Sequence, residues 1–372
     1  MQYVIKTEEL NAICSKILYA VDSNGLSDIT ETLELKIEDN TFYLQVTNRE
    51  YFVKIKLASN YTEEFHATVN AELFLKLISR ITTELVTLEI ENNILKIKGN
   101  GEYKLPMIYD GPNLLELPRI EIDNVTNTFN MDGSVLNSIN TYNSKQIAGK
   151  TVMSPLQTLY YIDKEGAITF TTGACVNDFE LEKDVKLLLN AKLVKLFKLF
   201  KNEKVVFTIG QDAVTDALIQ TKVRFVTDDI ELTAIIPNND ADINKFPASV
   251  IRSRVTNDYA NMVTLNRVEL LQAINRLAIF SEKSTAINKN YGKFEFTTDK
   301  VIVYDMNKIN SEEIYYANST SITDSYSAVL DFTDIKSILE VSTNEYLSFR
   351  FGDHQAFVCT QDNIHNVIPE VA

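Results

Sequence analysis

Residues 71–97 read AELFLKLISRITTELVTLEIENNILKI, and this stretch predicts a helix followed by a two-stranded hairpin. From Ala71 to Ile81 the apolar residues recur at helical spacing. Over 86–90 and 94–97 they alternate with polar residues, on either side of a turn at 91–93, as in half-buried strands. A helix packed against an antiparallel hairpin is an α+β unit.

The same order of elements occurs twice more along the 372 residues. A helix at 191–202 and another at 332–341 are each followed by alternating strands, and in the third segment these strands are 346–350 and 356–358. In each segment a first amphipathic helix precedes, at 7–20, 132–142 and 266–282. Prolines cluster near 106–118 and 237–247, where turns are expected. The sequence therefore predicts an α+β fold of three repeated domains, 1–120, 121–252 and 253–372, each with two helices packed on antiparallel sheets.

The overall charge limits the functions that are open to the chain. With 36 Lys+Arg against 51 Asp+Glu the net charge is −15, which excludes a uniformly basic nucleic-acid binder but allows one basic surface. Cys14, Cys175 and Cys359 are too far apart in sequence to suggest a disulfide framework, so we expect a reducing, cytoplasmic location. Because no apolar run approaches the ~18 residues of a membrane span, we expect no membrane partner.

Positive charge is concentrated in one predicted helix. Between residues 191 and 204 a lysine recurs at every third position, at 192, 195, 198 and 201, while leucine and phenylalanine occupy the other side. The ordinary alternative is a solvated surface helix. Over the six predicted helices with their flanking residues (7–20, 70–83, 131–150, 190–204, 265–283 and 331–343) the net charge is +4, so the rest of the chain carries −19. This asymmetry favours one surface that meets phosphates on a body that repels them.

No catalytic or metal-binding pattern is present in the sequence. His66, His354 and His365 lack the spacing of metal ligands, and a structural or exposed role is expected for each. The run 240–244 imitates a calcium loop but has Lys245 and Ile251 where that loop needs Gly and Glu. Dinucleotide and phosphate loops are also missing. We expect no enzyme, no metal and no cofactor.

Several stretches, in their order and spacing, resemble one known family. They are residues 70–80 and 101–106 in the first segment, the step at 245–247, and residues 266–281 in the third segment. The chain resembles the bacterial DNA polymerase III beta subunit, the beta sliding clamp, over nearly its full length. The resemblance implies a head-to-tail homodimer of three-domain chains that closes as a ring around duplex DNA, with helices lining the hole and sheets forming the outer wall.

The resemblance also implies a function and a set of partners. The protein would be a processivity factor that tethers the catalytic subunit of the replicative DNA polymerase, and it would be loaded by a clamp-loader ATPase. A ring that slides needs diffuse attraction to phosphates, because contacts to bases would hold it at one position. The expected DNA-facing cations are Lys16, Lys76, Arg80, Lys145, Lys150, Lys192, Lys195, Lys198, Lys201 and Arg276.

Two protein interfaces follow from the same resemblance, and ordinary core packing is the alternative for each residue in them. The expected dimer contacts are Phe74, Leu77, Ile78, Tyr103 and Leu105 of one chain against Ile279 and Phe280 of the other. A cleft for short apolar motifs of the polymerase and other clamp-binding proteins would use Leu156, Thr172, Gly173, Val176, Pro247, Val250, Ile251, Val367, Ile368 and Pro369.

The cleft departs from the family pattern at three places: 172–178, Ser154-Pro155 and the C-terminal 368–372. We therefore expect altered partner preference, as in a divergent clamp from a phage or mobile element. Two further hypotheses remain at this stage. One is a clamp-like decoy or regulator that binds replication proteins without encircling DNA. The other is an unrelated α+β enzyme with a dispersed carboxylate site.

Overall fold

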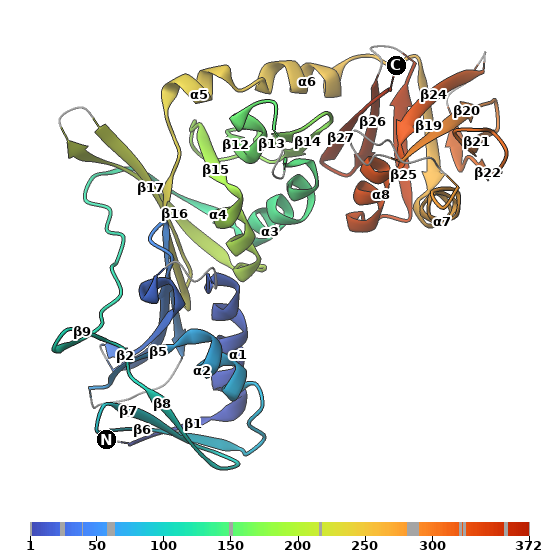
Figure 1. Ribbon diagram of the computed structural model, residues 1–372. Coiled ribbons are helices and arrows are strands. Elements are labelled where there is room, and N and C mark those ends of the chain that lie inside the picture. The colour runs from blue at the N-terminus through green and yellow to red at the C-terminus, as the bar shows by residue number, and fades with distance from the viewer. Residues whose placement is uncertain are drawn as a thin grey trace. The chain divides into compact units, whose positions relative to one another are not determined.

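The computed structural model describes residues 2–22, 27–38, 40–57, 64–148, 152–215, 218–280, 290–319, 322, 325–352 and 356–371 (Figure 1). Its contacts divide the chain into two compact units. The first comprises Met1–Asn137 and Lys192–Asn238, and the second comprises Ser138–Ala191 and Asn239–Ala372. None of the helices that the described residues form is long and apolar enough to cross a membrane.

The first unit begins with elements of the first repeat and ends with strands of the second. In chain order they are β1 (Gln2–Lys6), α1 (Thr7–Ile17), η1 (Leu18–Ala20), η2 (Asp28–Glu31), β2 (Thr32–Glu38), β3 (Thr41–Thr47), β4 (Tyr51–Leu57), β5 (His66–Asn70), α2 (Ala71–Ile78), β6 (Leu85–Glu91), β7 (Ile94–Lys98), β8 (Glu102–Pro106), β9 (Tyr109–Asp110), β10 (Asn113–Leu114), β11 (Val125–Asp132), η5 (Leu196–Leu199), β16 (Lys204–Thr215), β17 (Leu218–Val226) and β18 (Ile230–Ile236).

Two helices, α3 (Gly133–Tyr142) and α4 (Ala191–Lys195), cross the division between the units. The second unit contains η3 (Asn143–Gln146), η4 (Pro155–Thr158), β12 (Leu159–Asp163), β13 (Gly166–Phe170), β14 (Ala174–Asp178), β15 (Leu187–Asn190), α5 (Asp240–Lys245), α6 (Ala248–Thr256), β19 (Asn261–Asn266), α7 (Arg267–Leu277), β20 (Tyr291–Phe296), β21 (Lys300–Asp305), β22 (Ser311–Tyr315), β23 (Asn318–Ser319), β24 (Tyr326–Asp331), α8 (Phe332–Val341), β25 (Tyr346–Phe351), β26 (Ala356–Gln361) and β27 (Ile364–Pro369).

The sheets are built from sets of four antiparallel strands. In the first unit, β5-β2-β3-β4 and β18-β17-β16-β11 form one eight-stranded sheet, joined where β4 pairs with β18. In the second unit, β15-β12-β13-β14 and β27-β26-β25-β19 are joined where β14 pairs with β27, and the short β23 extends that sheet. Two sets stay separate, β1-β6-β7-β8 and β22-β21-β20-β24. The predicted α+β fold with a repeated unit is confirmed.

The opening stretch of sequence forms the expected helix and hairpin. Asn70 caps α2, its side chain accepting a hydrogen bond from the backbone N–H of Leu73 at 3.0 Å. The hairpin between β6 and β7 turns at Asn92 and Asn93, both with positive φ (50° and 64°), as a type I′ turn requires. The predicted helix at 332–341 coincides with α8, whereas α2 and α7 end earlier than expected, at Ile78 and Leu277.

The lysine-rich segment differs from the prediction of one continuous helix over 191–202. The α-helix stops at Lys195, and residues 196–199 form the 3-10 helix η5. The sequence itself explains this, because its period is three: lysine, leucine, then valine or phenylalanine. In a 3-10 helix residues three apart eclipse one another, so each residue type forms one row. The leucine, valine and phenylalanine rows are buried, and the lysine row is exposed.

Candidate nucleic-acid interface and docking surfaces

The four lysines of the exposed row differ in what they contact. Lys192 lies 3.8 Å from Asp22 and 3.6 Å from Glu50. Lys198 lies over the Tyr19 ring, 3.6 Å from its centroid, and burial together with the charge of Lys195 lowers the pKa of its ammonium group. Lys195 and Lys201 are exposed and have no ion-pair partner within the part of the chain that the structure describes. These two are the cations of the row that are most available to phosphates.

The remaining predicted cations are spread over both units. Lys76 and Arg80 are exposed on and just after α2, and Lys76 forms a salt bridge with Glu72 one turn earlier. Lys145 is exposed on η3. Arg276, at the end of α7, makes a two-pronged ion pair with Glu312 of β22. Lys150 lies outside the described residues.

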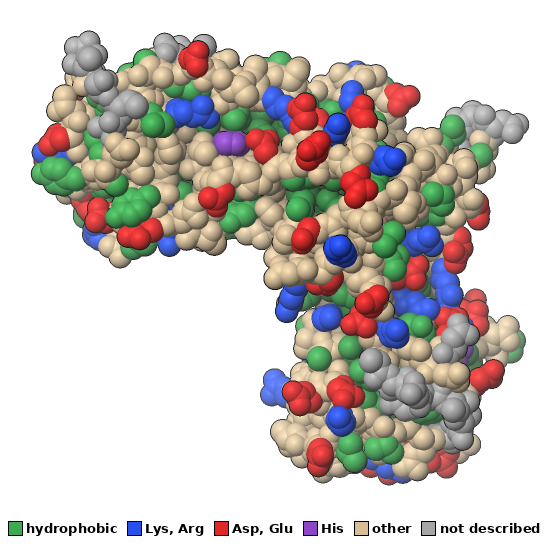
Figure 2. Space-filling model, turned by 180° about the vertical axis from the view of Figure 1, so that it is seen from behind, with side chains coloured by type: hydrophobic (Ala, Val, Ile, Leu, Met, Phe, Trp, Pro, Cys, Tyr) green, Lys and Arg blue, Asp and Glu red, His purple; other side chains and the backbone are tan. Residues whose placement is uncertain are grey.

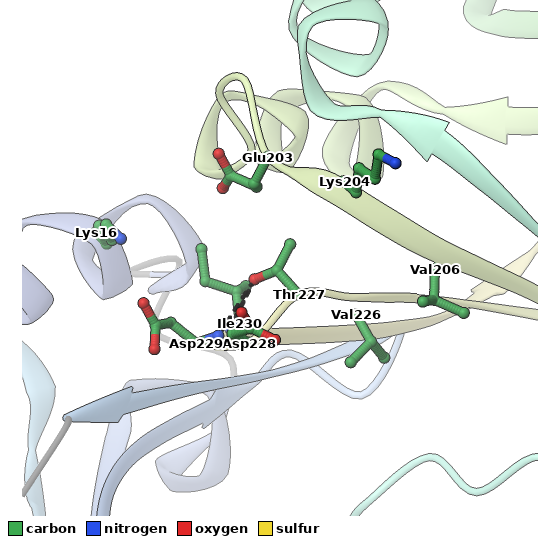
Figure 3. A pocket seen from close by; sticks show the side chains of 9 residues that line it. All are labelled: Lys16, Glu203, Lys204, Val206, Val226, Thr227, Asp228, Asp229 and Ile230. Carbon is green, nitrogen blue, oxygen red and sulfur yellow. Dashed lines mark hydrogen bonds between the residues drawn. The ribbon is translucent and has the colours of Figure 1, made fainter.

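Lys16 has an acidic neighbourhood. It borders an open hollow of about 570 Å³ that is also lined by Glu203, Lys204, Asp228 and Asp229. Figure 3 shows Lys16 on α1 across the hollow from Glu203 and Asp229. With three carboxylates against two lysines, this hollow is poorly suited to bind phosphate. Acidic and basic side chains are likewise interspersed over the face of the molecule shown in Figure 2.

Several of the residues predicted to form the docking cleft lie together in an apolar cluster of the second unit. Leu156, Val176 and Ile251 belong to one buried cluster, with Val367 packed against it. Phe246 extends the cluster and stacks on the Tyr161 ring at 4.7 Å between centroids. Helix α6 thus packs over β14 and β27, and the residues brought together come from three distant parts of the chain.

The rim of the cleft contains the other predicted residues, with one exception. A Cβ on Gly173 would lie 2.5 Å from the carbonyl oxygen of Val367 and 3.4 Å from Pro369, so only glycine fits there. Thr172 and Val250 are exposed, and Pro247 is half-buried. Ile368 is the exception, because its side chain packs in the core of the third repeat, in a different cluster. Met153, three residues before Leu156, is 95% exposed, and the sequence has no periodic signal that would have singled it out.

The C-terminal residues that depart from the family pattern are bound to the third repeat. The Tyr326 hydroxyl donates a hydrogen bond to the Glu370 carboxylate, and the Val371 N–H donates to the Val329 carbonyl at 2.9 Å. At the other departure, Cys175 is fully buried, and burial raises the pKa of its thiol. These residues therefore have structural contacts in this chain.

Seven apolar residues were predicted to form the dimer contacts, and the structure separates them into two classes. Phe74 and Ile78 are fully buried beneath α2, so their side chains cannot contact a second chain directly. Leu77 and Leu105 are half-buried, and Tyr103 is partly exposed on the edge strand β8. Ile279 and Phe280, just after α7, are 78% and 54% exposed.

Sequence reasoning missed Leu73, which is 55% exposed on α2. A signal was available: α2 carries apolar residues at 71, 73, 74, 75, 77 and 78, more than one face can bury. A helix that is apolar over so much of its circumference needs a second apolar partner besides its own sheet.

The histidines have structural partners. His66 Nε2 lies 2.7 Å from the buried Glu34, and His365 Nε2 lies 3.2 Å from Asp178. Burial, with Arg350 nearby, lowers the pKa of His365 despite the opposing charge of Asp178. His354 falls outside the described residues. No group of three or more His, Cys, Asp or Glu among the residues placed by the structure is arranged to hold a metal ion.

Comparison with known proteins gives a consistent result. Residues 1–112 match the family described as DNA polymerase III beta subunit, N-terminal domain. The beta sliding clamp of Mycoplasmopsis pulmonis is 30% identical over 133 residues, which cover 35% of this chain and 34% of that protein. The matched region thus spans about a third of the curated relative.

Solved structures share the fold along the whole chain. The sliding clamp of Bacillus subtilis superposes with a TM-score of 0.78 at 14% identity, covering 100% of this chain and 99% of its own. The beta subunit from Thermotoga maritima gives 0.78 at 16% identity with the same coverage. A Pseudomonas aeruginosa clamp bound to griselimycin gives 0.80 at 14% identity, again with 100% and 99% coverage.

Proposed function

We propose that the chain is a divergent member of the bacterial beta sliding clamp family and that it acts as a DNA sliding clamp. Two chains would close head to tail into a ring around duplex DNA and would tether the replicative polymerase. The clamp-loader ATPase and other proteins carrying the docking motif would be its further partners. We propose no catalytic step for it and place its action in the cytoplasm, where bacterial DNA is replicated.

The observation that carries this proposal is the way in which the repeats are joined. We assign three domains, 1–120, 121–252 and 253–372, each with two four-stranded sets. At one edge of each set lies the strand that comes last in the hairpin series: β4 and β8 in the first domain, β14 and β18 in the second, and β22 and β27 in the third. Within the chain, such an edge strand pairs with an edge strand of the next domain: β4 pairs with β18, and β14 pairs with β27. Continuing this rule leaves β22 of the third domain and β8 of the first as matching free edges.

Both free edges have features of surfaces awaiting a partner. An edge strand presents unpaired N–H and C=O groups, which proteins normally protect. Exposed apolar side chains occur in both domains: Tyr103 on β8 itself and Leu73 on α2 in the first, and Ile279 and Phe280, just after the helix α7 that packs on β22, in the third. A heterologous contact of this kind closes into a ring when the rotation per subunit suits it.

The DNA-facing role rests on the exposed lysines. In a ring the helices of each domain would face the hole, as the resemblance implies. Lys195 and Lys201 would then supply mobile charges within a Debye length, ~8 Å, of the phosphates. Lys192 and Lys198 would contribute less, because carboxylates and an aromatic ring already hold them.

Topological retention tests this proposal directly. Dissociated chains are allowed to reassociate in the presence of nicked circular plasmid, and DNA-bound protein is isolated by gel filtration at moderate salt. Cutting the plasmid once should release the protein, because a ring slides off the ends. Protein that remains on the linear DNA, or that never remains with the circle, would contradict the proposal. In the second case, continued binding of polymerase peptides would favour a clamp-like regulator.

A further inference from the structure

The structure assigns one register to the contact between the free edges, and this inference rests on the proposed ring. We propose that β22 of one chain pairs antiparallel with β8 of a second copy so that Glu313 lies opposite Lys104 and Ile314 lies opposite Tyr103. The Lys104–Glu313 pair would then select the correct alignment of two copies. Three independent features of the strands lead to this register.

Hydrogen-bond direction is the first feature. In β8 the odd residues face β7, since the Met107 N–H donates to the Asn93 carbonyl and the Gly99 N–H to the Gly101 carbonyl. In an antiparallel strand, successive residues direct their backbone groups to opposite sides. Residues 102, 104 and 106 of β8 therefore point their backbone groups toward the free edge.

The same reasoning applies to β22. Its even residues face β21, since the Tyr316 N–H donates to the Asp299 carbonyl and the Asp305 N–H to the Asn310 carbonyl. Residues 311, 313 and 315 therefore face the free edge. Directly opposite residues in a ladder either both face the partner strand or both face away. An odd residue of β22 must consequently lie opposite an even residue of β8.

Side-chain direction is the second feature. Tyr103 and Leu105 lie opposite Ile97 and Leu95, both fully buried, so they share the core face of their sheet. On β22, Ile314 is 3% exposed and lies opposite the fully buried Val301. Placing Ile314 opposite Tyr103 continues one apolar row across the contact. On the outer face, this register places Glu313 opposite Lys104.

Charge is the third feature, and it separates the remaining alternatives. A slip of two residues one way would put Glu313 opposite Glu102, a like-charge pair, which destabilises a ladder. A slip the other way would put Glu313 opposite Pro106, which carries no charge to attract it. Within its own sheet Glu313 forms a salt bridge with Lys300 at 2.8 Å, and only the proposed register gives it an opposite charge across the contact as well. Glu313 and Lys104 are accessible for it, with side chains 46% and 59% exposed.

Lys104 also lacks a good partner within its own sheet. Its directly opposite neighbour on β7 is Lys96, a like charge, and its contact with Glu102 is 3.8 Å long. Glu313 from a second copy would lie on the other side of Lys104 and offset this repulsion. The two junctions inside the chain differ by one position: the first residue of β14, Ala174, lies opposite the fourth residue of β27, Val367, whereas the first residue of β4, Tyr51, lies opposite the fifth residue of β18, Ala234. In the proposed contact, Ser311, the first residue of β22, would lie opposite Pro106, the fifth residue of β8, as at the junction of β4 with β18.

A charge swap tests the assignment. Glu313→Lys and Lys104→Glu, each alone, place like charges in both contacts of a ring and should weaken self-association about tenfold or more. An equimolar mixture of the two single variants should dimerise like the wild type, because each mixed ring contains one swapped and one native pair. Sedimentation velocity measures all three. Unchanged self-association of both single variants, or no recovery in the mixture, would overturn the proposal.

Engineered disulfides test the register itself without depending on stability. The pair K104C/E313C should crosslink two chains under mild oxidation, since directly opposite Cα atoms lie about 5.5 Å apart. The matched control E102C/E313C should not, because its diagonal separation is about 7–8 Å. The three native cysteines are buried and give little background. If the wild type dimerises but only the control variant E102C/E313C crosslinks, the register is overturned while the ring stands. If the wild type stays monomeric, both the register and the ring are overturned.

Discussion

At the scale of single residues, Glu38 shows how a few charged groups fix the path of the chain between repeats. Its carboxylate accepts hydrogen bonds from Lys54 Nζ at 2.8 Å and from Arg119 Nη2 at 2.9 Å. Arg119 belongs to the segment that leads to β11, and Leu115 and Leu117 of this segment are buried. The three charges therefore pin the connection onto the first sheet.

The pKa of Glu38 makes this contact dependent on pH. Burial alone would raise that pKa, but the hydrogen bonds from Lys54 and Arg119 outweigh it and lower the pKa to about 2. In the unfolded chain the pKa of Glu38 is about 4.5. Because the folded pKa is lower, the stability that the carboxylate contributes is complete above pH 4.5 and is lost as the pH falls through about 2. Glu38→Gln should lower the free energy of unfolding at pH 7 by about 1 kcal/mol and by less at pH 3.

Urea denaturation at the two pH values measures this effect. Glu182→Gln serves as the control, because Glu182 is exposed and carries no such contacts. An equal loss of stability at both pH values in the Glu38 variant would show that the carboxylate charge is not responsible.

Val250 offers a test of the docking cleft that leaves the fold intact. It is 59% exposed on α6, beside the buried Ile251. Val250→Asp should weaken binding of polymerase peptides at least tenfold, because it places a charge at an apolar rim. The melting temperature should not change. The matched control is Ser249→Asp on the same helix, which is also exposed. Equal binding by both variants in calorimetric titration would exclude this rim from the site.

At the scale of elements, the segment 191–201 separates packing from charge by its period of three. Phe197 and Phe200 are fully buried, and Phe197 lies edge-on to Phe225 at 5.1 Å. The lysine row on the opposite side is thereby held at the surface. Two of its members, Lys192 and Lys198, also contact Asp22 and Tyr19, which follow α1 in the first repeat.

This difference predicts unequal effects of lysine substitutions on DNA binding. Lys195→Ala combined with Lys201→Ala should make the plot of log association constant against log salt concentration less steep, by the amount expected for about two lost phosphate contacts. The melting temperature should not change. Lys192→Ala combined with Lys198→Ala should have the smaller effect on DNA and should lower stability. Fluorescence anisotropy over a salt series, with Lys164→Ala as a control for exposed charge, compares the pairs. Equal salt slopes for both pairs would contradict this view of the row.

The elements also show how far the sequence could be interpreted. The helix at 332–341 and the hairpin of β6 and β7 were predicted correctly, because their apolar periods are regular and their caps and turns are local. The 3-10 form of 196–199 was not predicted, since a lysine at every third residue was read as a wide helical face. Phe74 and Ile78 were misplaced for a related reason: sequence identifies an apolar face but not which part of it the chain itself covers.

At the scale of the whole molecule, the threefold repeat was visible in the sequence, but the joining of the sheets was not. Pairing of β4 with β18 and of β14 with β27 depends on contacts between strands about 180 residues apart, which no local pattern encodes. The same limit applies to the cleft, where Leu156, Ile251 and Val367 meet only in the folded chain. The proposal that β8 and β22 are complementary edges depends on the same long-range pairings.

The central claim is that two copies close through those edges around an open channel. Low-resolution electron microscopy of the purified protein, at a concentration where sedimentation shows two chains per particle, tests it most directly. Class averages should show rings with a central hole, and Ile279→Asp combined with Phe280→Asp should yield single open chains. Filled two-chain particles, or a wild type that remains a single chain at micromolar concentration, would contradict the account.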